Sequence, residues 1–291
     1  MDKSKFISLL NLGLVCLIKL ANGSSSLPDD SNCGVPQEAH VTDAPVKRIV
    51  NGDEAQPYKW PWAVLLEIDG LLHCGGTLVR TNNGSHVVLT AAHCVDGSFG
   101  DVARWDAKMG FITRNNALNE EHYQGHKVKQ IIIHPNYLPS TLQNDIAVLI
   151  LDGKVNETDG VYPACVTKAM YAAGEQCVTI GWGQVSQDNL DANSDKLQQV
   201  YKTVQSSKTC NDSFGDSFDK VTMMCAGTNK DSSGPCLSDS GGPLLCRRNQ
   251  KWYLTGIVSW SFICGLTKDP PVYTNVLQYV VSGWLREVAG I

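Results

Sequence analysis

The chain lacks an excess of basic residues and lacks paired cysteine motifs. Its 24 lysine and arginine residues are outnumbered by 29 acidic residues, which gives a net charge of −5. A mildly acidic chain does not have the basic footprint of a nucleic-acid-binding protein. None of the 11 cysteines belongs to a Cys-x-x-Cys pair, which argues against zinc ribbons and thioredoxin-like redox sites. Internal repeats and low-complexity tracts are also missing, which excludes repeat architectures.

The composition is that of a globular chain rich in turns. Hydrophobic residues make up 43% of the 291 residues and charged residues 18%, so neither a disordered chain nor a coiled coil is expected. The 26 glycines and 12 prolines favour many turns, and hence β structure over a helical bundle. Cysteines dispersed along the chain indicate disulfides and an oxidising compartment. Because 11 is odd, one cysteine is lost on processing or remains free.

The N-terminus has the pattern of a secretory signal. A positively charged start, an apolar stretch over residues 6–18 and small residues up to Gly23 predict a signal peptide over residues 1–23. The apolar stretch is too short to span a bilayer comfortably, and an uncleaved anchor is the alternative. Cleavage after Gly23 would remove Cys16 and leave ten cysteines, an even number. The sequence therefore predicts a secreted, extracellular protein.

The body of the chain has the texture of an all-β fold. Residues 24–48 are polar, carry three prolines and one cysteine, and are expected to form a linker. Apolar runs of strand length follow at 63–66, 87–89, 129–133, 146–151, 177–180 and 253–258. A helical period is found only over 276–288. This pattern predicts one all-β domain closed by a C-terminal helix.

Three separated residues are candidates for a nucleophilic site. Ser240 precedes two glycines, which permit a tight turn and close approach of a substrate, but a serine hydroxyl is a poor nucleophile until a base takes its proton. His93 follows an apolar strand and is the candidate base, with packing beside a disulfide as the structural alternative. Asp145 heads another apolar strand. If this carboxylate is buried it needs donors, and an imidazole N–H would satisfy it and fix the tautomer.

The conjunction of these residues is similar to a known family. The order His, Asp, Ser, with Ala-Ala-His-Cys at 91–94, Asp-Ile-Ala-Val-Leu at 145–149 and Asp-Ser-Gly-Gly-Pro at 239–243, resembles the chymotrypsin/trypsin family of serine endopeptidases. Further motifs at 60–62, 74–78, 181–183 and 271–274 extend the resemblance over 49–291. It implies two six-stranded antiparallel β-barrels with the active site between them.

The resemblance also implies roles for single residues. Ser240 would be the nucleophile, His93 the general base and Asp145 the residue that orients it, while the N–H groups of Ser238 and Ser240 would form the oxyanion hole. Ser259, Trp260 and Ser261 would offer backbone to an extended substrate strand.

An activation junction is a second implication of the resemblance. The sequence Arg48-Ile49-Val-Asn-Gly resembles the point at which family zymogens are cleaved, whereas a solvated linker arginine is the alternative for Arg48. Cleavage after Arg48 would free the amine of Ile49, which in the family pairs with the acid before the nucleophile, here Asp239. Residues 24–48 are then a propeptide and 49–291 the peptidase domain.

Partners and cofactors follow from the same resemblance. A protein or peptide substrate and an activating protease are expected, and protein inhibitors of proteases are plausible partners. No organic cofactor, nucleic acid or membrane partner is expected. We also expect no metal, because the stretch at 110–114 lacks the first acid of the calcium loop of some members.

The ten cysteines of the mature chain can be paired by the resemblance. The implied pairs are Cys33–Cys165, Cys74–Cys94, Cys177–Cys246, Cys210–Cys225 and Cys236–Cys264. The first pair would tether the propeptide to the catalytic domain after cleavage. Sequons begin at Asn83, Asn156 and Asn211 in polar, turn-like stretches, so we expect surface N-glycosylation.

Two departures from the family pattern bear on activity. Ser238 stands where the family usually has glycine, and its Cβ resists some backbone conformations. Gly234 stands at the base of the specificity pocket, where trypsin-like members carry aspartate, while Ser261 and Pro271 add bulk to the wall. A buried lysine or arginine side chain would then be unpaired. The sequence predicts a shallow, uncharged pocket that favours small or medium apolar residues.

The same departures motivate a rival hypothesis of another class. A protein with Ser238 and a crowded or blocked pocket could be a weakly active or inactive protease-fold binding protein. The complete set of candidate catalytic residues and the Arg48 junction favour the enzyme, because an inactive scaffold has no need of either.

Overall fold

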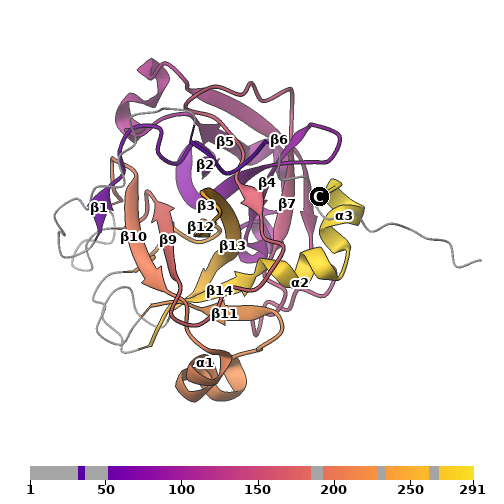
Figure 1. Ribbon diagram of the computed structural model, residues 1–291. Helices are drawn as coiled ribbons and strands as arrows, with labels where there is room; N and C mark the ends of the chain where they lie inside the picture. Colours follow the sequence, from indigo (N-terminus) through magenta and orange to yellow (C-terminus); the bar gives the residue numbers. More distant parts are fainter. Residues whose placement is uncertain (1–31, 37–51, 185–192, 228–233, 262–268) are drawn as a thin grey trace, which may run out of the picture.

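The computed structural model describes residues 32–36, 52–184, 193–227, 234–261 and 269–291. In this part of the chain β-strands predominate, and two groups of strands lie one above the other (Figure 1). Each of the six apolar runs of the sequence falls on a strand. No helix among the described residues combines the length and the apolar character needed to cross a membrane.

The first group of strands closes into a barrel. Its strands pair in the order β2-β3-β4-β7-β6-β5, with antiparallel registers such as Thr77 opposite Leu89. The bounds are β2 Ala63–Ile68, β3 Leu71–Arg80, β4 His86–Thr90, β5 Trp105–Met109, β6 Gln124–Ile133 and β7 Ala147–Leu151. In β5, Trp105, Ala107 and Met109 are buried while the residues between them are partly exposed, so alternate side chains fill the barrel.

The second group forms an eight-stranded sheet. Seven strands follow the order β1-β10-β9-β12-β13-β14-β11, and β8 pairs with β13. The bounds are β1 Asp53–Glu54, β8 Cys165–Val166, β9 Gln176–Gly181, β10 Gln198–Thr203, β11 Met223–Cys225, β12 Pro243–Arg248, β13 Lys251–Trp260 and β14 Val272–Asn275.

Only one of the two expected six-stranded barrels is established. In the described part of the second sheet, β10 and β11 approach each other through an isolated bridge between Val204 and Ala226. Two backbone bonds flank it, from the Gly227 N–H to the Thr203 carbonyl (2.8 Å) and from the Gln205 N–H to the Cys225 carbonyl (3.0 Å). Pairing between these two strands is therefore confined to their ends, and it does not make a continuous ladder around the ring.

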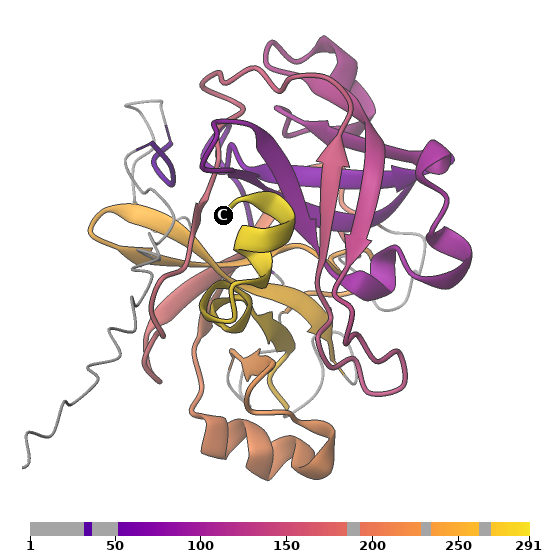
Figure 2. The same ribbon diagram turned by 90° about the vertical axis from the view of Figure 1, so that its right-hand side faces the viewer.

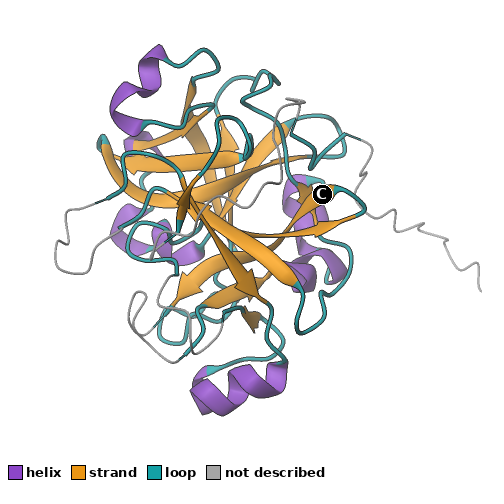
Figure 3. Cartoon of the chain, turned by 60° about the vertical axis from the view of Figure 1, so that its left-hand side comes forward, coloured by secondary structure: helices purple, strands orange, loops and turns teal. Residues whose placement is uncertain are grey.

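Helices occupy the periphery of the described chain (Figure 3). They are α1 Ser207–Phe214, α2 Val276–Val281 and α3 Trp284–Ala289, with short 3-10 turns η1 Ala92–Cys94, η2 Gly97–Phe99, η3 Val102–Arg104, η4 Arg114–Asn119 and η5 Gly215–Ser217. The single C-terminal helix expected over 276–288 is wrong in detail. Gly283 has a φ of 82°, a left-handed conformation that ends α2 and starts α3 in a new direction.

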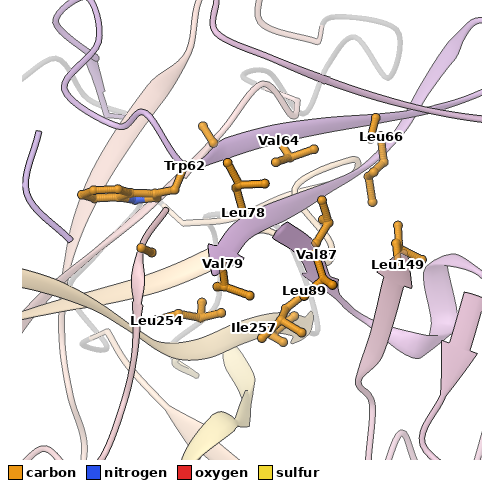
Figure 4. Packing of buried hydrophobic residues seen from close by; sticks show 14 of the residues in the cluster. Trp62, Val64, Leu66, Leu78, Val79, Val87, Leu89, Leu149, Leu254 and Ile257 are labelled. Atoms are coloured by element: carbon orange, nitrogen blue, oxygen red, sulfur yellow. The ribbon is translucent and has the colours of Figure 1, made fainter. Parts of the chain in front are cut away.

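One hydrophobic core joins the two groups of strands. Leu78, Leu89 and Leu149 of the barrel pack in the same cluster as Leu254 and Ile257 of β13 (Figure 4). All five side chains are fully buried. Figure 2 shows the barrel and the sheet in contact along this junction, with the C-terminal helices beside it. The shared core fixes the position of the barrel relative to the second sheet, and the candidate site lies where the two meet.

Disulfides reinforce this arrangement. Four of the implied pairs are bonded in the structure, namely Cys33–Cys165, Cys74–Cys94, Cys177–Cys246 and Cys210–Cys225. Cys236 is also disulfide-bonded, whereas its implied partner Cys264 lies outside the described residues.

The short segment at 32–36 is held by more than its disulfide. The Gly34 N–H donates to the Pro163 carbonyl, and the Gly34 carbonyl accepts from the Trp252 N–H, each at 2.8 Å. Gly34 has a φ of 71°, and a Cβ at this position would lie 2.5 Å from the Trp252 carbonyl oxygen, so only glycine fits. The segment is thus attached to the body through backbone bonds on both sides.

Truncation of a core leucine tests this packing. We expect Leu149→Ala to lower the free energy of unfolding by about 2–5 kcal/mol, because it removes buried methyl groups and leaves a cavity. Leu118, with 78% of its surface exposed, provides the matched control, and Leu118→Ala should leave the melting temperature almost unchanged. Equal melting temperatures for both variants would contradict the core described here.

Candidate active site

The carboxylate of Asp145 is fully buried and is satisfied by three donors. Its Oδ2 accepts from the ring of His93 at Nδ1 (2.7 Å) and from the Ser259 hydroxyl (2.6 Å), and its Oδ1 accepts from the His93 backbone N–H (2.9 Å). Asp145 precedes β7, and its carbonyl accepts from the Thr274 hydroxyl of β14 (2.6 Å). These donors satisfy the polar atoms of the buried carboxyl group, which would otherwise be costly to bury.

His93 is oriented by this carboxylate. The residue lies in η1 directly after β4, and Cys94 beside it is bonded to Cys74 of β3. When the Nδ1–H group donates a hydrogen bond to Asp145, Nε2 of the imidazole carries the free lone pair. The His93 side chain is 25% exposed, so Nε2 can reach a ligand. The disulfide packs beside the ring, with Cys94 Sγ 3.9 Å from Nε2. His93 therefore packs against a disulfide, as the alternative interpretation expected, and is also oriented by Asp145 as a general base would be.

Ser240 lies in the turn that leads into β12. Its carbonyl accepts from the Gly75 N–H of β3 (2.8 Å), and the next residue, Gly241, donates to the Val258 carbonyl of β13 (2.9 Å). Gly241 has a φ of 78°, and a Cβ there would lie 2.1 Å from the Thr90 hydroxyl. The turn is therefore pressed against both halves of the molecule. Within the described residues no hydrogen bond joins Ser240 Oγ to His93 Nε2, a contact that often tightens only when substrate binds.

Ser238 has a left-handed backbone conformation. Its φ is 68°, which costs a residue with a Cβ roughly 1–2 kcal/mol. The loop around it is held by backbone bonds from the Asp239 N–H to the Cys236 carbonyl (3.0 Å) and from the Gln184 N–H to the Leu237 carbonyl (2.9 Å). Considering only the described residues, no acceptor takes the N–H of Ser238 or of Ser240, so both donors are available to a ligand.

The carboxylate of Asp239 is bonded to this loop and to Gly183, and it borders a small cavity. Its Oδ1 accepts from the Gly183 N–H (2.8 Å) and its Oδ2 from the Cys236 N–H (3.0 Å). A Cβ on Gly181 would lie 2.0 Å from Oδ1, so glycine is needed for the close approach. A cavity of about 30 Å³ lies beside the carboxylate, lined also by Gly234 and Thr179. Among the described residues no cation pairs with Asp239.

Burial dominates the ionisation of Asp239. Although part of the residue reaches solvent, its carboxyl group is desolvated, and this raises the pKa of Asp239 to about 6. The two backbone N–H groups lower the pKa without offsetting the burial. The site therefore has a carboxylate whose charge is only partly compensated by the described chain.

The expected specificity pocket has a feature that the sequence analysis missed. Gly234 provides no side chain, and a Cβ placed on it would lie 3.4 Å from Pro271 Cγ and 3.8 Å from Lys202 Nζ. Lys202 belongs to β10 and is only 1% exposed. The Lys202 ammonium therefore lies close to Gly234, the residue that the sequence analysis places at the base of an uncharged pocket. The sequence signal is a lysine inside a strand, but the sequence alone does not tell which face of that strand is buried.

The structure places the remaining predicted residues as follows. Ser259 is buried and its hydroxyl contacts Asp145, a role that the sequence analysis did not assign, while Ser261 is partly exposed. Trp260 packs edge-on against Phe214 (4.9 Å between ring centres). Asn83, Asn156 and Asn211 are exposed, as glycosylation requires. Arg48 and Ile49 lie outside the described residues.

A metal site finds no support among the described residues. The one group of three potential ligands there is Cys74, His93 and Cys94, whose ligand atoms lie within 4.8 Å of one another. Both sulfur atoms belong to one disulfide, and a disulfide does not supply the thiolates that bind metals.

Comparison with protein families gives one match. The family described as Trypsin matches residues 49–282, which is most of the chain. The match includes every residue of the candidate site except Arg48.

Replacement of Ser238 tests the oxyanion loop. We expect Ser238→Gly to raise kcat, because glycine adopts a φ of 68° without strain and removes the Cβ that crowds the substrate side of the loop. The value of one oxyanion donor, about 10²–10³ in kcat, sets the upper limit of the gain. Ser238→Ala is the matched control, since it removes the hydroxyl and keeps the Cβ, and it should not raise kcat. The same kcat in all three proteins would show that the Cβ is harmless.

Titration of Asp239 gives a pH prediction. A pKa raised from 3.8 to about 6 means that the folded state holds a proton that the unfolded state has lost, so stability falls as pH rises from about 4 to 6. We expect the melting temperature of the uncleaved Ser240→Ala protein to fall as the pH rises over this range. The added substitution Asp239→Asn should make this fall in melting temperature smaller. Asp216→Asn, at an exposed position, is the control. An undiminished decline in the Asp239→Asn protein would contradict the assignment.

Proposed function

Because the chain belongs to the trypsin family of serine proteases, a class of peptide hydrolases with protein substrates, we propose that it is an endopeptidase with Ser240, His93 and Asp145 as its catalytic residues. The observation that carries this proposal is the fully buried Asp145 carboxylate, bonded at once to the ring and the backbone of His93. This arrangement fixes the tautomer that a general base needs.

The chemistry follows from these positions. Ser240 Oγ attacks the carbonyl carbon of the scissile peptide bond, and His93 Nε2 takes its proton and later delivers it to the leaving amine. Asp145 stabilises the imidazolium formed in between. The N–H groups of Ser238 and Ser240 donate to the oxyanion of the tetrahedral intermediate. The backbone of Ser259–Ser261 would hold the substrate as an extended strand.

We propose that the protein is made as a zymogen and is activated by cleavage after Arg48. The incompletely compensated Asp239 carboxylate and the cavity beside it support this proposal, because the ammonium of Ile49 would supply the missing charge and lower the pKa of Asp239. The family match also begins at Ile49. The bond between Cys33 and Cys165 would then keep residues 24–48 attached after cleavage. The activating protease would be a separate partner.

Secretion belongs to the same proposal. The signal-like segment at 1–23 and the disulfides of the described chain support an extracellular protein, because disulfides persist in oxidising compartments. Exposed Asn83, Asn156 and Asn211 are the proposed glycosylation sites. Protein inhibitors of proteases would be partners in that compartment.

For the residue before the scissile bond, we propose small or medium side chains rather than lysine or arginine. Pro271 Cγ would contact a Cβ on Gly234 at 3.4 Å, which limits the depth of the pocket. No acid is contributed at Gly234, and the Lys202 ammonium nearby would repel a basic side chain. On sequence alone, the favoured side chains are apolar.

A protease-fold binding protein with little turnover is the second candidate. The left-handed φ of Ser238 favours it, because a Cβ in this position costs energy and crowds the substrate side of the loop.

Labelling with a fluorophosphonate discriminates the two candidates. The probe reacts with an activated serine, so we expect the secreted protein to be labelled after cleavage at Arg48 and not before. Cleaved Ser240→Ala protein should remain unlabelled with its fold intact. Absence of labelling after verified cleavage would favour the binding protein, and labelling of the Ser240→Ala variant would refute Ser240 as the nucleophile.

A further inference from the structure

Lys202 is a buried charged residue that the proposed reaction does not use. It lies in β10 opposite Cys177 of β9, and it is 1% exposed while its neighbour Tyr201 is 46% exposed. A buried ammonium is costly unless it is hydrogen-bonded or paired. Lys202 interacts with another group of the protein, and an ammonium has three donor hydrogens, so it can take a further acceptor.

The lysine side chain runs toward Gly234, the residue expected at the base of the specificity pocket. A Cβ on Gly227 would lie 3.6 Å from Lys202 Cδ, and a Cβ on Gly234 would lie 4.0 Å from Cε and 3.8 Å from Nζ. The stem therefore passes Gly227, and the ammonium ends directly behind Gly234. These separations are ordinary van der Waals distances, so a carbon atom placed on Gly234 would meet the ammonium without a clash.

This geometry reverses the charge found in trypsin-like members of the family. Those members resemble this chain but carry an aspartate at the position of Gly234, which attracts basic side chains. Here the position has no side chain, and among the described residues the charged group nearest to a Cβ placed on it is the Lys202 ammonium. A substrate side chain that reaches Gly234 from the pocket therefore approaches a cation.

We propose that Lys202 is a specificity-determining residue that selects aspartate or glutamate before the scissile bond, in place of the apolar side chains that the sequence alone favours. This inference rests on the proposed peptidase function. An ammonium has three donor hydrogens, so a substrate carboxylate can accept one of them while the lysine keeps other partners. A hydrogen bond between two charged groups is about twice as strong as one between neutral groups, and more so where water is excluded.

The size of the pocket agrees with this choice of substrate. Pro271 limits its depth at Gly234, and aspartate and glutamate are small and medium side chains. Glutamine and asparagine have the same shapes without the charge, so they separate the effect of charge from that of size. Lysine and arginine would be excluded by both depth and repulsion.

The first test compares matched peptide substrates on the wild-type protein. The protein is cleaved after Arg48 with immobilised trypsin, which is then removed, and its active sites are counted by fluorophosphonate labelling. We expect kcat/KM for peptides with aspartate before the scissile bond to exceed that for asparagine peptides by about tenfold or more, and likewise glutamate over glutamine, because hydrogen bonds to charged groups contribute about 1.5–3 kcal/mol. Equal values within both pairs would overturn the proposal.

Two sets of variants assign the effect to Lys202. Lys202→Met keeps the length of the side chain and removes its charge, so the acid preference should disappear; Lys196→Met is the control, because Lys196 is half exposed and pairs with Glu54. Gly234→Asp leaves Lys202 in place and sets a carboxylate beside its ammonium, so this variant too should lose the preference. Gly234→Asn has the same bulk without charge and should retain it. Retention of the preference in the Gly234→Asp protein would overturn the assignment.

The outcomes separate this inference from the proposed function. Fluorophosphonate labelling without any acid preference would refute the role of Lys202 and leave the peptidase intact. No labelling after verified cleavage would refute the peptidase, and with it the inference. Should Lys202→Met fail to fold, the comparison of Gly234→Asp with Gly234→Asn still decides the question.

Discussion

The buried carboxylate of Asp145 is the constraint on which the geometry of the site depends. An ionised group without solvent contact must be matched by donors, and its donors come from both halves of the molecule. His93 follows β4 of the barrel, whereas Ser259 belongs to β13 of the second sheet. The same hydrogen bonds therefore set the orientation of the imidazole and the position of one half against the other. A change in the packing between the halves would displace the donors and the base together.

Two further charged groups lie at the ends of one segment of the second half. The Lys202 ammonium lies behind Gly234, and the Asp239 carboxylate lies beside the cavity at the other end of 234–239. The N–H of Ser238 belongs to this segment, and the N–H of Ser240 directly follows it. Both charged groups therefore lie close in sequence to the proposed nucleophile. Asp145 is matched by ring, hydroxyl and backbone donors, while Asp239, within the described residues, is matched only by backbone N–H groups.

The sequence predicted those features that short motifs carry. The approach of His93 to Asp145 and four disulfides could be anticipated, because the motifs identify a family whose members share one arrangement in space. Two features were not predicted, because they depend on local dihedral angles and on where strands end. They are the split of the C-terminal helix at Gly283 and the isolated bridge between Val204 and Ala226. Lys202 was missed for a different reason. Its approach to Gly234 brings β10 close to a loop residue distant in the sequence, and no local pattern reports which face of β10 is buried.

The conformation of Ser238 bears on the choice between enzyme and binding protein. A left-handed serine costs roughly 1–2 kcal/mol, a tolerable share of the 5–15 kcal/mol by which domains are stable. Backbone bonds at Cys236, Leu237 and Gln184 hold the loop in this conformation, and no described residue takes the N–H of Ser238. Strain that persists where a donor is left free is typical of functional sites. If the loop had no role in binding an oxyanion, a relaxed conformation with that N–H bonded inside the protein would be more stable. The left-handed φ of Ser238 is therefore compatible with the proposed catalysis as well as with the binding protein, and turnover of the Ser238→Gly variant distinguishes the two.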